Sequence, residues 1–69
     1  MTRDHVIRAV DEGLPFEINM ADGKSYRVDD RYRISVGKTT VIVLDDKDLP
    51  HLLPLLTMTG ISYLKPNGA

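Results

Sequence analysis

The sequence predicts an α+β fold: an N-terminal helix packed on a strongly bent, antiparallel five-stranded sheet or a small barrel of the SH3 or Sm kind. Two observations predict this class. Residues 3–12 have the apolar spacing of a short helix, and residues 16–44 alternate apolar with polar side chains around two turn signals. A chain of 69 residues forms a single domain, which divides into a helix at 1–14, a barrel at 15–64 and a frayed tail at 65–69.

The N-terminal helix is predicted from a stripe of apolar residues three and four positions apart. The stripe consists of Val6, Ile7, Ala9 and Val10. Thr2 is the expected N-cap, Gly13 ends the helix, and Pro15 prevents the helix from resuming. A helix this short is unstable alone in water, so we expect it to pack against the sheet.

The first hairpin turns at Asp22-Gly23, yet a two-residue loop there would place the apolar side chains of its two strands on opposite faces. A three-residue loop over residues 21–23 keeps these side chains on one face. It pairs Phe16 with Val28 and Ile18 with Tyr26. The last residue of the loop, a glycine, then takes the left-handed conformation that glycine adopts most easily.

The second hairpin is predicted from alternation over residues 32–36 and an apolar strand over residues 39–44, joined by a two-residue turn at Gly37-Lys38. This turn pairs Val36 with Thr39, Ile34 with Val41, and Tyr32 with Val43. Residues 41–44 are apolar on both faces, which indicates a central strand covered on its second face by the N-terminal helix.

The last third of the chain is rich in apolar residues but contains Pro50 and Pro54, which exclude one continuous helix. We predict an extended piece at 49–52, a helical turn at 53–56 and a final strand at 58–64. The apolar segment is too short and too interrupted to cross a bilayer, so we expect no membrane partner.

The composition narrows the possible functions. The lack of cysteine excludes disulfides and thiolate metal sites, and His5 and His51 are too few for a structural zinc site, so we expect no cofactor. A net charge of -1 argues against a protein that coats nucleic acid. The first residues do not resemble a signal peptide, and we expect a cytoplasmic location. Because a chain this short has a thin core, oligomerisation is the remaining way to bury more surface.

Three segments, PFEINMADGKSYRV, VIVLDD and LLTMTGI, make nearly the whole chain resemble a group of small uncharacterised bacterial proteins. The pattern of that group is a short helix, Pro-Phe-x-Ile, Asp-Gly-Arg-x-x-x-Val, an apolar strand, and an ending like Leu-Leu-x-Val-Thr-x-Ile. Lys24 replaces the arginine of this pattern, and Met58 and Gly60 depart from its ending. The resemblance implies the architecture and no activity.

The motifs that suggest catalysis have simpler structural explanations. A phosphate-binding loop needs a glycine five positions before Gly37, and Tyr32 stands there. The acidic residues at 45–48 are interrupted by Lys47 and suit a turn better than a calcium loop. No serine or threonine has the context of an activated nucleophile, so we expect that the protein is not an enzyme.

Two surfaces remain as candidate sites. The first is an apolar interface for a second copy of the chain or for another protein, in a non-enzymatic binding or assembly module. Its residues are Leu52, Leu55, Leu56, Met58, Ile61 and Tyr63. The alternative is an outward-facing basic strip that binds RNA, as in Sm-like modules. Its residues are Arg27, Arg31, Arg33, Lys24 and Lys38.

Overall fold

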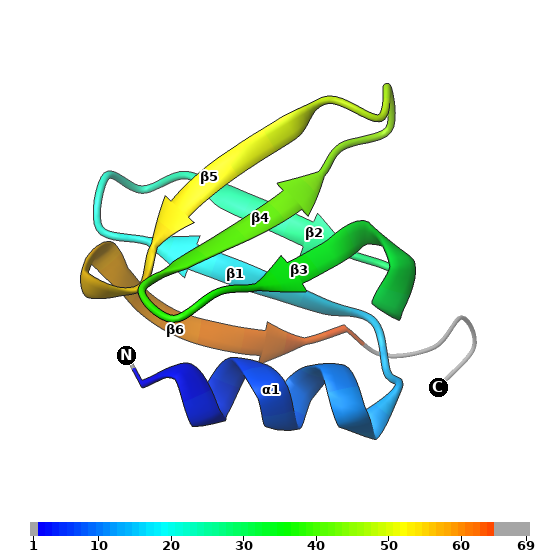
Figure 1. The fold of residues 1–69 in the computed structure, drawn as a ribbon, viewed down its shortest axis with the longest axis horizontal. Helices are drawn as coiled ribbons and strands as arrows, with labels where there is room; N and C mark the ends of the chain where they lie inside the picture. The colour runs from blue at the N-terminus through cyan, green and yellow to red at the C-terminus, as the bar shows by residue number, and fades with distance from the viewer. Residues whose placement is uncertain (1, 65–69) are drawn as a thin grey trace.

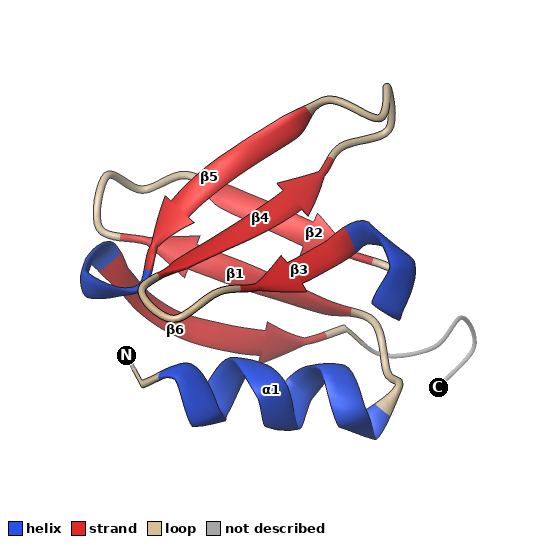
Figure 2. Ribbon diagram, in the orientation of Figure 1, coloured by secondary structure: helices blue, strands red, loops and turns tan. Residues whose placement is uncertain are grey.

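The computed structural model describes residues 2–64 of the chain. Within this range the chain forms one α-helix and two three-stranded antiparallel sheets, ordered β2-β1-β6 and β3-β4-β5 (Figures 1 and 2). The elements are α1 (Arg3–Glu12), β1 (Phe16–Met20), β2 (Ser25–Val28), β3 (Ile34–Val36), β4 (Thr40–Leu44), β5 (Pro50–Pro54) and β6 (Met58–Tyr63), with 3₁₀ turns at Arg31–Arg33 and Leu55–Thr57. The α+β prediction is confirmed, whereas the predicted five-stranded sheet or closed barrel is wrong. The predicted tail at 65–69 lies outside the described residues.

The strand that the prediction lacks is β5. It pairs with β4 over its whole length, and the helical turn follows it at Leu55–Thr57 instead of 53–56. The backbone N–H of Leu55 donates to the carbonyl of Thr39 at 3.0 Å, so these two residues form a hydrogen-bonded pair of the β4–β5 ladder. Because hydrogen-bonded pairs alternate with non-bonded pairs in an antiparallel ladder, the backbone groups of Pro50 and Pro54 point away from β4. Proline is tolerated at such positions, and its missing N–H leaves β5 as an edge strand that does not extend the sheet into a barrel.

The first hairpin has the predicted register. Phe16 pairs with Val28 and Ile18 pairs with Tyr26. The backbone N–H of Met20 donates to the carbonyl of Lys24 at 2.9 Å and closes the three-residue loop. Gly23 has a φ of 90°, the left-handed conformation that the loop requires.

The second hairpin is shifted by two residues from its predicted register. Val36 pairs with Val41 and Ile34 pairs with Val43, so the loop is longer than the predicted Gly37-Lys38 turn. Gly37 lacks the positive φ that a type II′ turn requires, and its N–H donates to the carbonyl of Thr40 at 2.8 Å. A Cβ at position 37 would lie 2.7 Å from that carbonyl oxygen, so this close approach requires glycine.

Tyr32 does not lie opposite Val43 as predicted, because residues 31–33 leave the strand and form a 3₁₀ turn. The Asp30 carboxylate accepts a hydrogen bond from the Tyr32 N–H at 2.9 Å, and the Asp30 carbonyl accepts one from the Arg33 N–H at 3.3 Å. These two bonds turn the chain at the corner between β2 and β3. The Tyr32 side chain is 85% exposed instead of buried.

The core lies between the inner faces of the two sheets and extends to one side of α1. Its buried residues are Val6, Ala9, Phe16, Ile18, Met20, Val28, Val41, Val43, Leu53, Leu55 and Met58. The helix follows Thr2 at its N-cap and ends at Gly13, whose φ is 72°, as predicted. Residues 3–12 are helical, a shorter segment than the predicted 1–14.

The helix does not cover the second face of β4, contrary to the prediction. It lies beside β6 and near β3, along the edges of the two sheets (Figure 1). The Arg3 Nε donates to the carbonyl of Gly37 at 2.9 Å and ties the start of α1 to the β3–β4 loop. The outer face of β4 therefore stays uncovered, and Ile42 is 38% exposed there. No helix within residues 2–64 is long and apolar enough to cross a membrane.

Candidate functional site

The outer face of the β3-β4-β5 sheet carries no charged side chain. Strand alternation places Val41, Val43 and Leu53 in the core and their neighbours on the outside. The outward positions are Ser35, Thr40, Ile42, Leu44, Pro50, Leu52 and Pro54. Ile42 lies directly opposite Leu52, which is 68% exposed, and Leu56 in the following turn is 93% exposed. We call Ile42, Leu44, Pro50, Leu52, Pro54 and Leu56 the apolar face.

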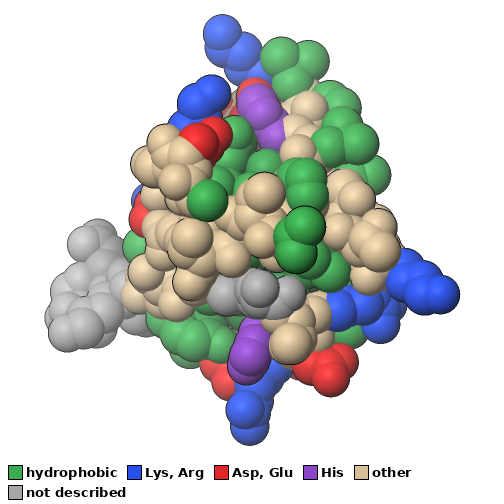
Figure 3. Space-filling model, turned by 90° about the vertical axis from the view of Figure 1, so that its left-hand side faces the viewer, with side chains coloured by type: hydrophobic (Ala, Val, Ile, Leu, Met, Phe, Trp, Pro, Cys, Tyr) green, Lys and Arg blue, Asp and Glu red, His purple; other side chains and the backbone are tan. Residues whose placement is uncertain are grey.

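Figure 3 looks at the end of the molecule that carries the turn at Leu55–Thr57, and hydrophobic side chains gather in the upper right of this view. Large exposed apolar groups are normally scattered on a protein surface, and a contiguous group of them marks an interaction site. The strand positions of this face can be buried without the desolvation of a charge, whereas Leu56 shares a surface hollow with Lys38.

The outer face of the β2-β1-β6 sheet is polar. A chain of side-chain hydrogen bonds crosses its three strands: the Ser25 hydroxyl donates to the Asn19 amide oxygen at 2.9 Å, and the Asn19 amide nitrogen donates to the Ser62 hydroxyl at 3.1 Å. Glu17 and Arg27 lie opposite each other on the same face. The outer face of β2-β1-β6 is therefore polar, whereas that of β3-β4-β5 is apolar. An antiparallel sheet that is packed on one face normally carries polar side chains on its other face, so the apolar side chains on β3-β4-β5 are not explained by the fold alone.

The structure separates the six residues of the predicted interface into three groups. Leu52 and Leu56 belong to the apolar face, whereas Leu55 and Met58 are 8% and 4% exposed and lie in the core. Ile61 and Tyr63 line a groove beside α1. The turn at Leu55–Thr57 causes the separation, because it directs neighbouring leucines to opposite sides.

Sequence reasoning missed Ile42, Leu44 and the two prolines as members of the apolar face. The sequence does indicate the outward position of Ile42, because in a strand it alternates with Val41 and Val43, which are buried. Only the pairing with β5, however, brings Leu52 opposite Ile42.

Two arginines of the predicted basic strip make contacts within the chain. The Arg27 Nε lies 2.6 Å from a carboxylate oxygen of Asp29, and a terminal nitrogen of Arg33 donates to the backbone carbonyl of Asp45 at 3.0 Å. Arg31 lies on the 3₁₀ turn, and Lys24 and Lys38 lie at the loops that follow β1 and β3. Two of the five cations of the predicted strip, Arg27 and Arg33, therefore already make contacts within the chain.

Asp45 and His51 form a contact that sequence reasoning did not identify. The hairpin between β4 and β5 brings the His51 Nε2 within 2.9 Å of the Asp45 Oδ2. The other carboxylate oxygen accepts hydrogen bonds from the backbone N–H groups of Lys47 at 2.8 Å and Leu49 at 3.0 Å. The hydrogen bond to His51 and that to the Leu49 N–H lower the pKa of Asp45 to about 2.

The His51 ring also contacts β2, because its centroid lies 5.3 Å from that of Tyr26. The nearby Ser25 hydroxyl is directed to Asn19, so it is not aligned with the Asp45–His51 pair as a nucleophile would be. No group of three or more His, Cys, Asp or Glu side chains in the described part of the chain is arranged to hold a metal ion. The Asp45–His51 contact joins the two ends of the β4–β5 loop, and the contact of His51 with Tyr26 connects the β3-β4-β5 sheet to β2.

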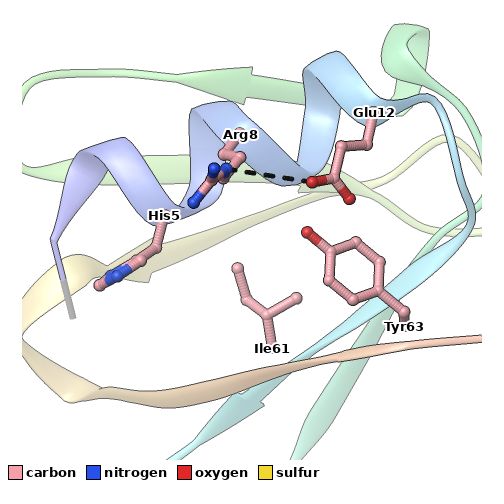
Figure 4. A pocket seen from close by; sticks show the side chains of 5 residues that line it. All are labelled: His5, Arg8, Glu12, Ile61 and Tyr63. Carbon is pink, nitrogen blue, oxygen red and sulfur yellow. Dashed lines mark ion pairs between the residues drawn. The ribbon is translucent and has the colours of Figure 1, made fainter.

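A groove of about 400 Å³ lies between α1 and β6 (Figure 4). Its helical wall consists of His5, Arg8 and Glu12, and its floor consists of Ile61 and Tyr63. The Arg8 Nε is 4.0 Å from a carboxylate oxygen of Glu12. Partial burial and a hydrogen bond to the Glu12 carboxylate raise the pKa of the Tyr63 hydroxyl.

The chain thus presents an apolar sheet face, a groove at the edge of the other sheet, and a structural Asp–His pair. The resemblance to the group of small bacterial proteins stays a prediction. No protein-family model, no curated protein and no solved structure matches this chain.

Proposed function

We propose that the protein is a non-enzymatic assembly module that binds a second copy of itself through the apolar face. The observation that supports this proposal is the absence of charge from the outer side of β3-β4-β5, together with the exposure of Leu52 and Leu56 at 68% and 93%. Leu52 and Leu56 are exposed to water, whereas the outer face of the β2-β1-β6 sheet is polar. Exposed leucines grouped on one face are typical of a surface that a partner covers.

A second copy suits this face because a two-fold interface places the same patch against itself. An apolar patch without charges is complementary to itself, whereas a charged patch would repel its copy. A standard interface buries about 800 Å² per partner, roughly a sixth of the 4882 Å² surface of this chain.

The prolines of β5 also determine how two copies would meet. Pro50 and Pro54 have no N–H at the outer edge of the strand, so edge-to-edge pairing through β5 lacks two donors. Association therefore proceeds face to face, with Ile42 and Leu52 of one copy between the same residues of the other.

The test is sedimentation equilibrium over a range of micromolar to millimolar concentrations. We expect a monomer–dimer equilibrium in the wild type, and a dissociation constant at least about 100-fold higher for Leu52→Asp, because the carboxylate must be desolvated in the interface. Ser62→Asp is the matched control: it adds the same charge to the polar outer face and retains an acceptor for Asn19. A wild type that stays monomeric at millimolar concentration contradicts the proposal.

A second candidate function, binding of single-stranded RNA, is favoured by the exposure of Tyr32 between Arg31 and Arg33. A tyrosine that is 85% exposed beside two arginines can stack on a base, a contact worth roughly 1–3 kcal/mol. We expect such binding to weaken steeply with salt and to be lost in Tyr32→Ala, as measured by fluorescence anisotropy with a labelled oligonucleotide. Binding that is unchanged in this variant, or absent at low salt, excludes the RNA function.

A further inference from the structure

The apolar face has a basic end. Its strands run between the β3–β4 loop at one end and the β4–β5 loop at the other (Figure 1). The β3–β4 loop carries the exposed Lys38, and the Arg3 side chain donates to the neighbouring carbonyl of Gly37 at 2.9 Å. Lys38 makes no ion pair within residues 2–64. We call Arg3 and Lys38 the basic end of the apolar face.

The opposite end of the face is acidic. The β4–β5 loop contains Asp45, Asp46 and Asp48, and Lys47 is its one cation. The Asp45 carboxylate already accepts hydrogen bonds from two backbone N–H groups and contacts His51. Asp46 and Asp48 are exposed, and neither forms an ion pair with another residue in the described range. We call Asp46 and Asp48 the acidic end.

Other charged groups near the two ends do not change their signs. Arg33 donates to a carbonyl of the β4–β5 loop, but it also lies 4.0 Å from the Asp30 carboxylate, which offsets its charge. At the basic end, a backbone hydrogen bond of 2.8 Å joins the β1–β2 loop to the turn at Leu55–Thr57. The β1–β2 loop adds Asp22 and Lys24, whose charges cancel.

This distribution of charge distinguishes between two ways of pairing the apolar face with itself. In a face-to-face dimer the two-fold axis lies between the two sheets and parallel to them. An axis along the strands places the basic ends together and the acidic ends together, so like charges repel. An axis across the strands places the basic end of each copy beside the acidic end of the other. Complementary charges at the rim of an interface determine its orientation, and here they favour the second axis.

We propose that two copies associate with the strands of their apolar faces antiparallel, so that the basic end of each copy contacts the acidic end of its partner. This inference rests on the proposed self-association and adds the orientation of the two copies. Ile42 and Leu52, opposite each other in mid-strand, then lie near the axis, and Leu56 of each copy lies toward the partner's Pro50. The charged ends form a polar rim around this apolar centre, as in typical interfaces.

A hollow at the basic end provides space for the partner's loop. It has a volume of about 410 Å³ and is lined by Lys38, Thr39, Leu55 and Leu56. The hollow combines an apolar wall with one cation, which suits a loop that carries carboxylates beside an apolar strand. Because the arrangement is symmetric, each dimer contains this contact twice.

Disulfide cross-linking tests the orientation directly, because the natural chain has no cysteine that would react in the background. An equimolar mixture of Lys38→Cys and Asp46→Cys chains is oxidised with diamide, and the products are separated by mass. We expect the mixed 38–46 disulfide to form at least about tenfold faster than either homodimeric disulfide, because only opposite ends meet. Faster formation of the 38–38 disulfide, or equal rates for all three products, overturns the proposed orientation.

Charge reversal gives a second test, by sedimentation equilibrium at low ionic strength, where exposed ion pairs are least screened. Lys38→Glu and Asp46→Lys should each raise the dissociation constant about tenfold, because each replaces two attractions by repulsions. The double variant Lys38→Glu/Asp46→Lys should return to within about threefold of the wild type. Asp48 is left unchanged, because its φ of 64° suits aspartate better than lysine.

The matched control for this rescue is Lys24→Glu/Asp46→Lys, which has the same net charge but reverses a lysine outside the apolar face. It should remain about tenfold weaker than the wild type. Equal dissociation constants for the two double variants overturn the orientation, because net charge alone then explains the effect. A wild type that dimerises while Lys38→Glu has no effect refutes only the orientation, whereas a wild type that stays monomeric refutes the self-association as well.

Discussion

The central position of Ile18 predicts how strongly the fold depends on one side chain. Ile18 is 0% exposed and lies between Tyr26 of β2 and Ile61 of β6. A domain of 69 residues has a free energy of unfolding of about 3–10 kcal/mol, and truncation of a buried isoleucine to alanine costs about 2–5 kcal/mol. Because strands flank Ile18 on both sides, the cavity cannot collapse easily, so we expect Ile18→Ala to remove about 3–4 kcal/mol.

Urea denaturation followed by circular dichroism measures this loss. With an m-value of about 1 kcal/mol/M, the midpoint should fall by about 3 M in Ile18→Ala while m stays unchanged. Ile42→Ala is the matched control, because Ile42 is 38% exposed on the neighbouring sheet and should cost about 1 kcal/mol in dilute protein. A cost below 1 kcal/mol at Ile18, or a larger cost at Ile42 in dilute protein, refutes the assignment of the core.

Two further predictions concern a charge and a turn. The pKa of Asp45 is lowered to about 2 in the folded chain from an ordinary value of 3.8, so its stabilising contribution is fully present above about pH 4 and is lost as the pH falls toward 2. Thermal unfolding across this range should show a weaker acid dependence in Asp45→Asn than in Asp46→Asn. Gly23 has a φ of 90°, whereas Gly60 has ordinary backbone geometry and open space around its Cα. Gly23→Ala should therefore destabilise the chain by about 1 kcal/mol and Gly60→Ala by less, and equal Tm values for the two variants contradict the turn geometry.

The first hairpin could be predicted from sequence because all its determinants are local. A slip of one residue would expose the whole apolar set of Phe16, Ile18 and Met20, and only one loop length keeps that set inside. The same argument does not fix the second hairpin. A shift of two residues returns every side chain to the same face, so the apolar pattern permits either pairing of Val36, and the conformation of Gly37 decides between them.

That residues 50–54 form a strand paired with β4 could not be predicted from the local sequence, because this pairing depends on contacts between segments. Prolines at positions 50 and 54 argue against a helix, but they are compatible with a strand only where the outward edge stays unpaired. The pairing with β4 creates both the apolar face and the contact between Asp45 and His51, so the candidate sites were predicted only in part.

The polar outer face of the β2-β1-β6 sheet has a consequence for the size of any assembly. The Ser25, Asn19 and Ser62 side chains on it bond to one another, so this face offers no apolar surface to a further copy. If two copies associate through the apolar face as proposed, we expect that contact to close at two copies, with the hydrogen-bonded faces toward the solvent.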